Sequence, residues 1–326
     1  TDITLAKNIA YNRDGGAIYI EGLNTTIINA ELIQNRVTGA NAKGGAVYVK
    51  GDFTKILNST FEMCTAYDGG VLYIDGDYAL IDGYSCLKSL ANNDGGAMYV
   101  AGDYATIADF NIALTNATNY GGAIYVAGNY LNIHNSNFTM CTAYNHNGGA
   151  IYVLGLNTTI YKSSFTMNKV NNQTGCGGSI AIHGNNTKIL NSTFMQCNAY
   201  DGGVIYINGS NTLIDGYSCI MSFAANNGGA IFVEGNYANI ADFNISLTNA
   251  TNYGGAIYVA GDFTKINNSS FTRCIADNYD GGALYIAGAN ATVSNSKFLQ
   301  NRVNQESGRG GSVDITGNYT KLLNCT

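Results

Sequence analysis

The chain has 326 residues, a net charge of −6 and charged side chains at only 12% of its positions, and it contains no proline or tryptophan. The absence of a basic cluster argues against a nucleic-acid partner, and no apolar run approaches the about 18 residues that a membrane span needs. Glycine, asparagine, threonine, tyrosine and isoleucine dominate, which is typical of short strands joined by tight turns.

A Gly-Gly pair recurs twelve times along the chain at spacings of 25–29 residues. A fixed period in this range indicates a solenoid, in which each repeat buries its apolar face against its neighbours. We therefore expect residues 1–326 to form one continuous solenoid rather than separate domains. The pairs begin at Gly15, Gly44, Gly69, Gly95, Gly121, Gly148, Gly177, Gly202, Gly228, Gly254, Gly281 and Gly310.

The first strand of each repeat covers positions 2 to 6, counted from the first glycine of the pair as zero. Positions 3 and 5 are apolar in all twelve repeats, as at Ile18 and Ile20, so this face of the strand is predicted to be buried. Position 4 lies between them and is predicted to point outward. It is aromatic in ten repeats, at Tyr19, Tyr48, Tyr73, Tyr99, Tyr125, Tyr152, Tyr206, Phe232, Tyr258 and Tyr285.

The rest of the repeat predicts two more short strands. Position 7 is always glycine, position 12 is aliphatic, position 14 is mostly Asn or Asp and indicates a corner, and position 17 is large and apolar, as at Phe138. Position 20 is small, often Asn or Cys. Three short strands and three turns of this length predict an all-β fold, a right-handed parallel β-helix with rungs ~4.8 Å apart. The stacked Asn positions are expected to form inter-rung amide ladders.

A second period of 133 residues lies above the first. The segment 115–128 recurs letter for letter at 248–261, so a block of five rungs is duplicated. The longest loops, 36–43, 169–176 and 302–309, follow the same spacing and are expected to project from one edge. Residues Thr1 and Thr326 fall at nearly the same point of the repeat, in ordinary repeat sequence. We expect the rod to continue there, through further repeats of a longer array or by head-to-tail stacking of another copy.

Two tetrads carry a resemblance to known families. Gly15-Gly-Ala-Ile18 and Gly148-Gly-Ala-Ile151 represent the first, and Phe165-Thr-Met-Asn168 represents the second. Their pairing resembles the polymorphic outer-membrane proteins of chlamydiae and the adhesin-like proteins of methanogenic archaea, and the composition is closer to the archaeal group. Four repeats, including Phe61–Cys64, read Phe-x-x-Cys and depart from the strict tetrad. The resemblance implies the β-helix and a cell-surface location, and it implies no catalytic residues.

Aspartates recur at position 8, as Asp52, Asp77 and Asp103 on consecutive rungs. The simpler interpretation is an Asx turn after the glycine, in which the side chain bonds to its own backbone two residues on. The alternative is a structural calcium site between rungs, since hard oxygen ligands suit that ion. Basic residues are sparse on the strands, so a polysaccharide lyase or hydrolase is the least favoured function, and no other cofactor is expected.

The outward aromatic stripe at position 4 has two interpretations. Stacked aromatic residues stabilise a sheet by about 0.2–1 kcal/mol per pair. Alternatively the stripe is a face for glycans or for another rod, because large exposed apolar patches mark interfaces. A patchier aromatic run at position 9 includes Phe53, Tyr78, Tyr104 and Tyr130.

Covalent chemistry is predicted at two kinds of residue. The eight cysteines are expected to be free and mostly buried, since Cys64 and Cys86 are out of register on adjacent rungs. The alternative is that Cys176 reaches Cys141 or Cys197 if its loop folds back. Asn-x-Ser/Thr sequons offer glycosylation sites in a surface protein. The candidates are Asn24, Asn116, Asn157, Asn249 and Asn290.

These features favour a non-enzymatic extracellular rod, an adhesin or the shaft of a surface fibre, whose partners are surface glycans or other copies of itself. A structural filament or cell-envelope polymer assembled by end-to-end stacking is the alternative, and a polysaccharide-active enzyme is third. Self-assembly without any glycan would separate the first two.

Overall fold

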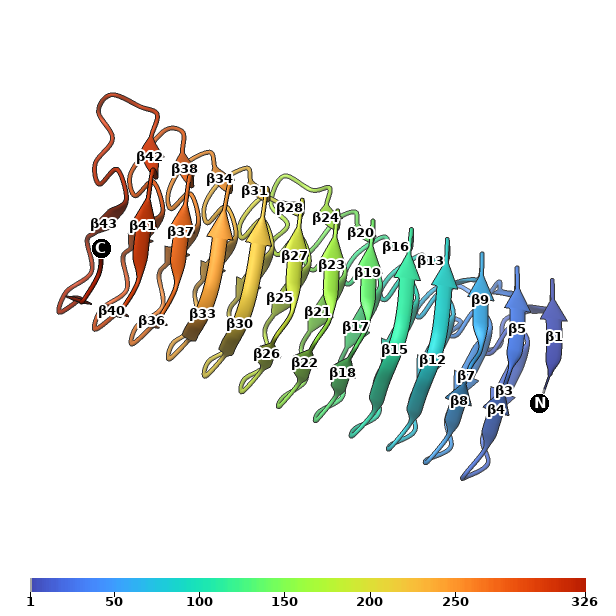
Figure 1. Ribbon diagram of the computed structural model, residues 1–326. Coiled ribbons are helices and arrows are strands. Elements are labelled where there is room, and N and C mark those ends of the chain that lie inside the picture. The colour runs from blue at the N-terminus through green and yellow to red at the C-terminus, as the bar shows by residue number, and fades with distance from the viewer. Residues whose placement is uncertain (1) are drawn as a thin grey trace.

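The computed structural model describes residues 2–326, with the side chains of Tyr84 and Tyr217 left aside. Successive rungs stack into a straight rod with the N-terminus at one end and the C-terminus at the other (Figure 1). The described residues form no helix, and three parallel sheets run the length of the rod. The predicted right-handed parallel β-helix of about twelve rungs is confirmed.

The first sheet contains the strands of positions 11–18. Its members are β1 (Ile3–Ala6), β4 (Thr26–Ile28), β5 (Ala30–Ile33), β8 (Lys55–Leu57), β9 (Thr60–Glu62), β12 (Leu80–Leu87), β15 (Thr106–Ala113), β18 (Asn132–His134), β19 (Asn137–Thr139), β22 (Thr159–Tyr161), β23 (Ser164–Thr166), β26 (Lys188–Leu190), β27 (Thr193–Met195), β30 (Leu213–Ile220), β33 (Asn239–Ser246), β36 (Lys265–Asn267), β37 (Ser270–Thr272), β40 (Thr292–Ser294), β41 (Lys297–Leu299) and β44 (Lys321–Leu323).

The second sheet consists of two-residue strands at positions 21 and 22. They are β2 (Ile9–Ala10), β6 (Arg36–Val37), β10 (Thr65–Ala66), β13 (Leu90–Ala91), β16 (Asn116–Ala117), β20 (Thr142–Ala143), β24 (Lys169–Val170), β28 (Asn198–Ala199), β31 (Phe223–Ala224), β34 (Asn249–Ala250), β38 (Ile275–Ala276) and β42 (Arg302–Val303).

The third sheet is the predicted first strand of each repeat, at positions 3 to 5. Its members are β3 (Ile18–Ile20), β7 (Val47–Val49), β11 (Leu72–Ile74), β14 (Met98–Val100), β17 (Ile124–Val126), β21 (Ile151–Val153), β25 (Ile180–Ile182), β29 (Ile205–Ile207), β32 (Ile231–Val233), β35 (Ile257–Val259), β39 (Leu284–Ile286) and β43 (Val313–Ile315). Pairing is in register, so that Tyr99 lies beside Tyr73 and Tyr125.

The prediction that position 14 forms a corner between two sheets is wrong. Asn29, Asn58, Asp109 and Asn135 have left-handed backbone, with φ of 52, 48, 50 and 52°, but the strands on either side belong to the same first sheet. In β12 and β15 the strand runs through this position without a break. Position 14 is therefore a kink within a sheet, and the real corner precedes the two-residue strands of the second sheet, which were too short to show a period.

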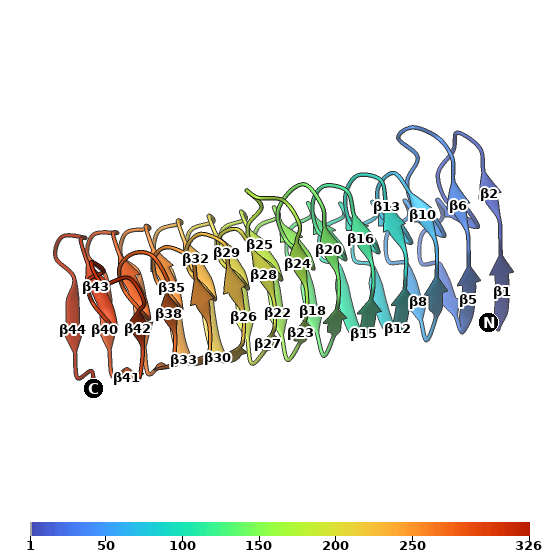
Figure 2. The ribbon, with the colours of Figure 1, turned by 90° about the horizontal axis from the view of Figure 1, so that it is seen from above.

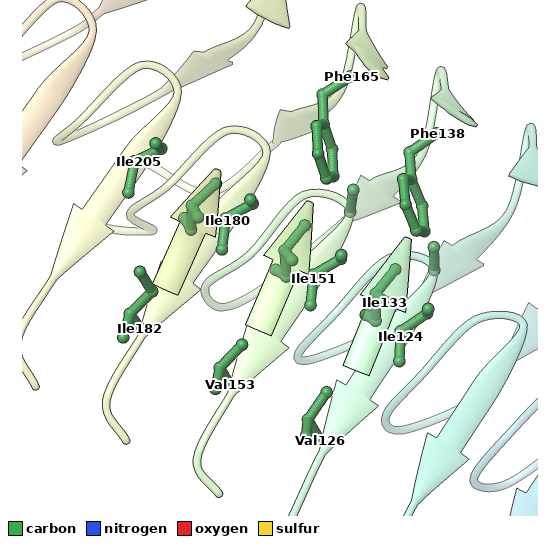
Figure 3. Packing of buried hydrophobic residues seen from close by; sticks show 14 of the residues in the cluster. Ile124, Val126, Ile133, Phe138, Ile151, Val153, Phe165, Ile180, Ile182 and Ile205 are labelled. Carbon is green, nitrogen blue, oxygen red and sulfur yellow. The ribbon is translucent and has the colours of Figure 1, made fainter. Parts of the chain in front are cut away.

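The core lies inside the coil and is built from stacked equivalents. Phe138 and Phe165 are fully buried, with ring centroids 4.8 Å apart and planes 6° from parallel. Figure 3 shows these rings one rung apart, facing the aliphatic columns of Ile124 and Ile151 from the third sheet. Like residues therefore pack on like residues along the axis, which is why one apolar pattern repeated twelve times suffices to specify the core.

The Phe-x-x-Asn and Phe-x-x-Cys repeats solve the same bonding problem. The Asn168 amide donates to the Phe138 carbonyl one rung back (3.0 Å) and accepts the Cys141 N–H (2.9 Å), although Asn168 is fully buried. At the equivalent place the Cys197 thiol donates to the Phe165 carbonyl (3.7 Å). Both side chains satisfy a carbonyl that the turn leaves unpaired, Cys more weakly, so the departure from the tetrad leaves the coil intact.

The long loops leave the rod between the second and third sheets. Figure 2 shows the loop after β6 projecting beyond its neighbours near the N-terminus. The equivalent loops follow β24 and β42, as predicted from the 133-residue period. The described residues include no helix long and apolar enough to span a membrane.

Candidate binding surfaces

The aromatic residues of position 4 form a ladder on the outer face of the third sheet, interrupted at one rung, which we call the sheet ladder. The ring centroids of neighbours are 4.5–5.7 Å apart. None of these side chains belongs to the core cluster, so the predicted outward orientation is right. The members are Tyr19, Tyr48, Tyr73, Tyr99, Tyr125, Tyr152, Tyr206, Phe232, Tyr258 and Tyr285.

The sheet ladder is nevertheless less open than an exposed adhesive stripe. Tyr48, Tyr73 and Tyr152 are only 6–8% exposed, most of the others are half-buried, and Tyr19 at the N-terminal end is 49% exposed. Part of the cover comes from the preceding turn: the Lys43 ammonium lies 4.2 Å from the centroid of the Tyr73 ring, and the Tyr120 ring packs on Tyr152. Burial, with Asp75 and Asp68 nearby, raises the pKa of Tyr73. The stabilising interpretation therefore accounts for most of this ladder.

One rung interrupts the sheet ladder. Ala181 occupies position 4 between Tyr152 and Tyr206 and is fully buried. The ring of His183, two residues later, fills the gap, with its centroid 5.1 Å from Tyr152 and 5.6 Å from Tyr206. Burial lowers the pKa of His183 despite the nearby Glu234 carboxylate. Ring contacts thus continue through the substitution, although the His183 ring is tilted by 39° and 49° to its two neighbours.

A column of carboxylates and amides lies beside the sheet ladder, in the turn before each Gly-Gly pair. Asp68 Oδ1 accepts the Asn93 amide (2.8 Å), and Asn93 Oδ1 accepts the Asn119 amide (2.6 Å). The predicted inter-rung amide bonds therefore exist in this turn, and position 14 makes them near the two ends of the rod, where Asn29 donates to Asp2 (2.8 Å) and Asn324 to Asn295 (3.3 Å). Asp94 Oδ1 accepts the Tyr120 N–H (3.0 Å), and burial, with a smaller contribution from Asp68, raises the pKa of Asp94 to about 6.

This shift predicts a pH-dependent stability. The folded chain holds the Asp94 proton more tightly than the unfolded chain, so the contribution is fully present below about pH 4 and is lost as pH rises through about 6. We expect Asp94→Asn to reduce the loss of unfolding free energy between pH 4 and 7.5 by on the order of 1–2 kcal/mol, after discounting for partial exposure. Denaturant melts at both pH values measure it.

Another rung of the same chain already has Asn at the position that this variant changes. Asn227 stands at the equivalent place 133 residues later, and its Oδ1 accepts the Tyr253 N–H (3.2 Å). The substitution should therefore fold normally. An unchanged difference between the two pH values would show that Asp94 does not titrate in this range.

A second aromatic ladder, at position 9, lies in the turn between the third and first sheets. Phe53, Tyr78, Tyr104 and Tyr130 occupy four consecutive rungs, and we call them the corner ladder. Their ring centroids are 5.0, 4.9 and 4.7 Å apart and adjacent planes lie within 8° of parallel. Each side chain is 43–48% exposed. The corner ladder is the open aromatic surface that the sequence assigned mainly to position 4.

The backbone at the corner ladder is left-handed, as it also is at positions 14 and 19 of the repeat. All four residues have left-handed φ, between 56 and 58°. Asn adopts this conformation more readily than bulky side chains do, and Asn24, Asn157, Asn186, Asn211 and Asn290 occupy the same position with φ of 55–60°. The corner ladder therefore has aromatic residues at a position where Asn would adopt the left-handed backbone more readily.

The position 8 aspartates bond to the backbone of the next rung. Asp52 Oδ1 accepts the Asp77 N–H (2.9 Å), Asp77 Oδ1 accepts the Asp103 N–H (2.8 Å), and Asp103 Oδ1 accepts the Asn129 N–H (2.7 Å). Within residues 2–326 no group of three or more His, Cys, Asp or Glu side chains could hold a metal ion. These bonds reach the next rung and not the N–H two residues on, so the aspartates link neighbouring rungs instead of forming the predicted Asx turn, and the calcium alternative gains no support from this geometry.

The cysteines and the glycosylation candidates differ in how far they are exposed to solvent. All eight cysteines are free thiols, six of them buried, with Cys176 and Cys325 partly exposed, and the Cys176 thiol bonds within its own loop. Among the glycosylation candidates, Asn24 and Asn290 are exposed at the corner. Asn116, Asn157 and Asn249 are half-buried, and Asn249 donates to Asp277 (3.0 Å). Asn24 and Asn290 are therefore the most accessible of the five.

Comparison with known proteins adds no family to this description. No protein-family model matches the chain, and no curated protein is significantly similar to it.

Proposed function

We propose that this chain is a non-enzymatic extracellular rod that binds surfaces, as a cell-surface adhesin or as the shaft of a surface fibre. The observation that carries the proposal is the corner ladder of Phe53, Tyr78, Tyr104 and Tyr130, which is stacked, half-exposed and held in a left-handed backbone. Its side chains form one strip along the rod axis, about 15 Å long at the rung spacing.

Conformational energy argues that the strip has a use beyond folding. Holding a bulky residue in this conformation costs of order 1 kcal/mol or more, and such strain gathers at functional positions. Ring stacking returns part of that energy. Five other rungs complete the same turn with Asn, so the coil does not require an aromatic residue there. An exposed aromatic strip that the fold does not need is the mark of a contact surface.

The form of the strip fits an extended partner. Because the ring planes are parallel and adjacent, each ring covers part of its neighbour, and the side chains remain 43–48% exposed. A glycan chain or a second rod laid along the axis would meet a contact every ~4.8 Å. The resemblance of the Gly-Gly-Ala-Ile and Phe-x-x-Asn tetrads to surface proteins supports the extracellular location.

The test replaces Tyr78, Tyr104 and Tyr130 together by Asn, the residue that already occupies this corner in five rungs. Since Asn suits the left-handed backbone, the triple variant should melt at or near the wild-type temperature. We expect its binding to immobilised cellulose, chitin or mannan, whichever the wild type binds, to fall at least about tenfold. Pull-down and sedimentation velocity measure binding to the glycans and association between rods.

The matched control changes Tyr73, Tyr99 and Tyr125 of the sheet ladder to Ser, which should lower stability and leave glycan binding in place at temperatures where the rod is folded. If the corner variant abolishes self-association instead of glycan binding, the strip joins rods side by side and the fibre interpretation holds. A wild-type rod that binds neither glycans nor itself would contradict the proposal.

A further inference from the structure

A groove runs along the shoulder of the rod, where the first sheet ends and the second begins. One stretch has a volume of about 530 Å³. It is lined by Leu114, Met140 and Met167, which we call its floor, by Asn116 and Thr142, and by Lys88 and Lys169 on its first and last rungs. We call this stretch the shoulder groove. A second depression of about 380 Å³ lies nearer the N-terminus and is lined by Met63, Lys7 and Arg36 among others. Its lining residues also lie at positions 19 and 21 of the repeat. The groove is therefore a property of the repeated coil and not of a single loop.

The floor of the shoulder groove is apolar and open to solvent. Leu114, Met140 and Met167 are 38, 44 and 39% exposed and stand on consecutive rungs. Their backbones are left-handed, with φ of 54–57°, because position 19 forms the corner between the two sheets. Three large apolar side chains in line make a strip about 10 Å long at the rung spacing. Contiguous exposed apolar surface inside a depression indicates a ligand.

The charges at the two ends have no carboxylate partner. Across residues 2–326 the ion pairs join Lys50 to Glu21 and Arg309 to Asp280, far along the chain from Lys88 and Lys169. Both lysines are exposed and stand three rungs apart, about 14 Å at the rung spacing. The rod as a whole carries −6, so a polyanion is repelled in general and attracted only where cations stand alone. The ligand is therefore anionic and long enough to reach both lysines.

The backbone hydrogen bonds around the groove favour an acidic polysaccharide over an acidic peptide as the ligand. The N–H groups of Asn116, Thr142 and Lys169, which border the groove, already donate to the preceding rung at 3.1, 3.0 and 3.0 Å. No strand edge is left to pair with an incoming peptide, so most of its amides would lose water beside Leu114, Met140 and Met167, with only the side chains of Asn116 and Thr142 to bond to. A sugar chain has few such amides. It presents C–H faces to the methionines, hydroxyls to water and carboxylates to the lysines.

We propose that the shoulder groove binds a linear, carboxylate-bearing polysaccharide laid along the rod axis. The site is separate from the corner ladder, and the proposal does not rest on the function proposed above.

The probe is polygalacturonate, titrated into the full chain at low and physiological salt. The double variant Lys88→Gln/Lys169→Gln should bind at least about tenfold more weakly, and its salt dependence should fall. The matched control is Lys55→Gln/Lys188→Gln, which makes the same change of charge at exposed lysines of β8 and β26, at the far end of the first-sheet strands. It should weaken binding less than about twofold. Met140→Gln tests the floor and should also weaken binding at unchanged salt dependence.

Four outcomes would overturn the proposal. They are a wild-type rod that does not bind polygalacturonate, equal losses in the two lysine pairs, equally tight binding of fully methyl-esterified polygalacturonate, and equally tight binding of polyglutamate through the same lysines, which would make the occupant an acidic peptide. The triple Asn variant of the corner ladder should retain polygalacturonate binding. Its loss there would show one shared surface and would also contradict a separate site.

Discussion

Gly122→Ala is expected to prevent folding of the rod or to destabilise it by more than about 4 kcal/mol. Gly122 is the second glycine of its pair, where the chain passes closest to the next rung. A Cβ there would overlap the Gly149 carbonyl oxygen and lie 2.6 Å from the Thr142 amide nitrogen. Every atom it meets belongs to backbone that is itself fixed by inter-rung hydrogen bonds, so no side chain can move aside.

The matched control is Gly22→Ala, at another glycine of the repeat. A Cβ on Gly22 would have Thr25 Oγ1 as its nearest neighbour, at 3.8 Å, and ordinary packing distance remains. We expect soluble protein with a wild-type circular dichroism melt for Gly22→Ala and aggregated or low-melting protein for Gly122→Ala. Similar melts for the two would show that adjacent rungs can separate locally, against the close packing of the Gly-Gly column.

The twelvefold period made most of the fold predictable. A strand with alternating Ile and Val at positions 3 and 5 can bury only one face, and one inward column of Phe138 and its equivalents defines the opposite wall. Because each rung repeats these constraints, errors in single residues average out. The exposure of the aromatic residues was harder to predict. Tyr73 and Tyr19 share a position in the repeat, but Tyr73 is 6% exposed and Tyr19 is 49% exposed. The cover over Tyr73 comes from Lys43, in a loop outside the repeating core.

The parts that could not be predicted depend on backbone conformation. Positions 9, 14 and 19 are all left-handed, yet residues as different as Tyr104, Asp109 and Leu114 occupy them in one rung. No propensity rule assigns a left-handed backbone to Tyr or Leu. The corner ladder and the shoulder groove both arise at such positions. The aromatic run of the corner ladder was visible in the sequence but its exposure was not, and the shoulder groove had no signal there. The two-residue strands of the second sheet are likewise too short for a period of two to be visible.

Phe138→Asp is expected to cost roughly 5 kcal/mol or more of unfolding free energy, the second large effect. Removing a buried Phe ring costs about 3–5 kcal/mol, and a carboxylate in its place has no cation or donor to pair with among stacked apolar columns. Phe138 is fully buried against Phe165, and Figure 3 shows the ring pointing into the coil. Denaturant unfolding followed by circular dichroism measures the loss.

Two companion variants separate burial from size. Phe138→Ile should cost only about 1–2 kcal/mol, because Ile112 fills the same position one rung earlier and is itself buried. Tyr125→Ser removes an outward, half-buried ring stacked between Tyr99 and Tyr152, for which about 1–3 kcal/mol is expected from the lost ring contacts. A loss of unfolding free energy that is much larger for Phe138→Asp than for Tyr125→Ser or Phe138→Ile is expected only if position 17 faces the core and position 4 faces away from it. Equal losses for Phe138→Asp and Tyr125→Ser would therefore reverse the inside and outside of the coil.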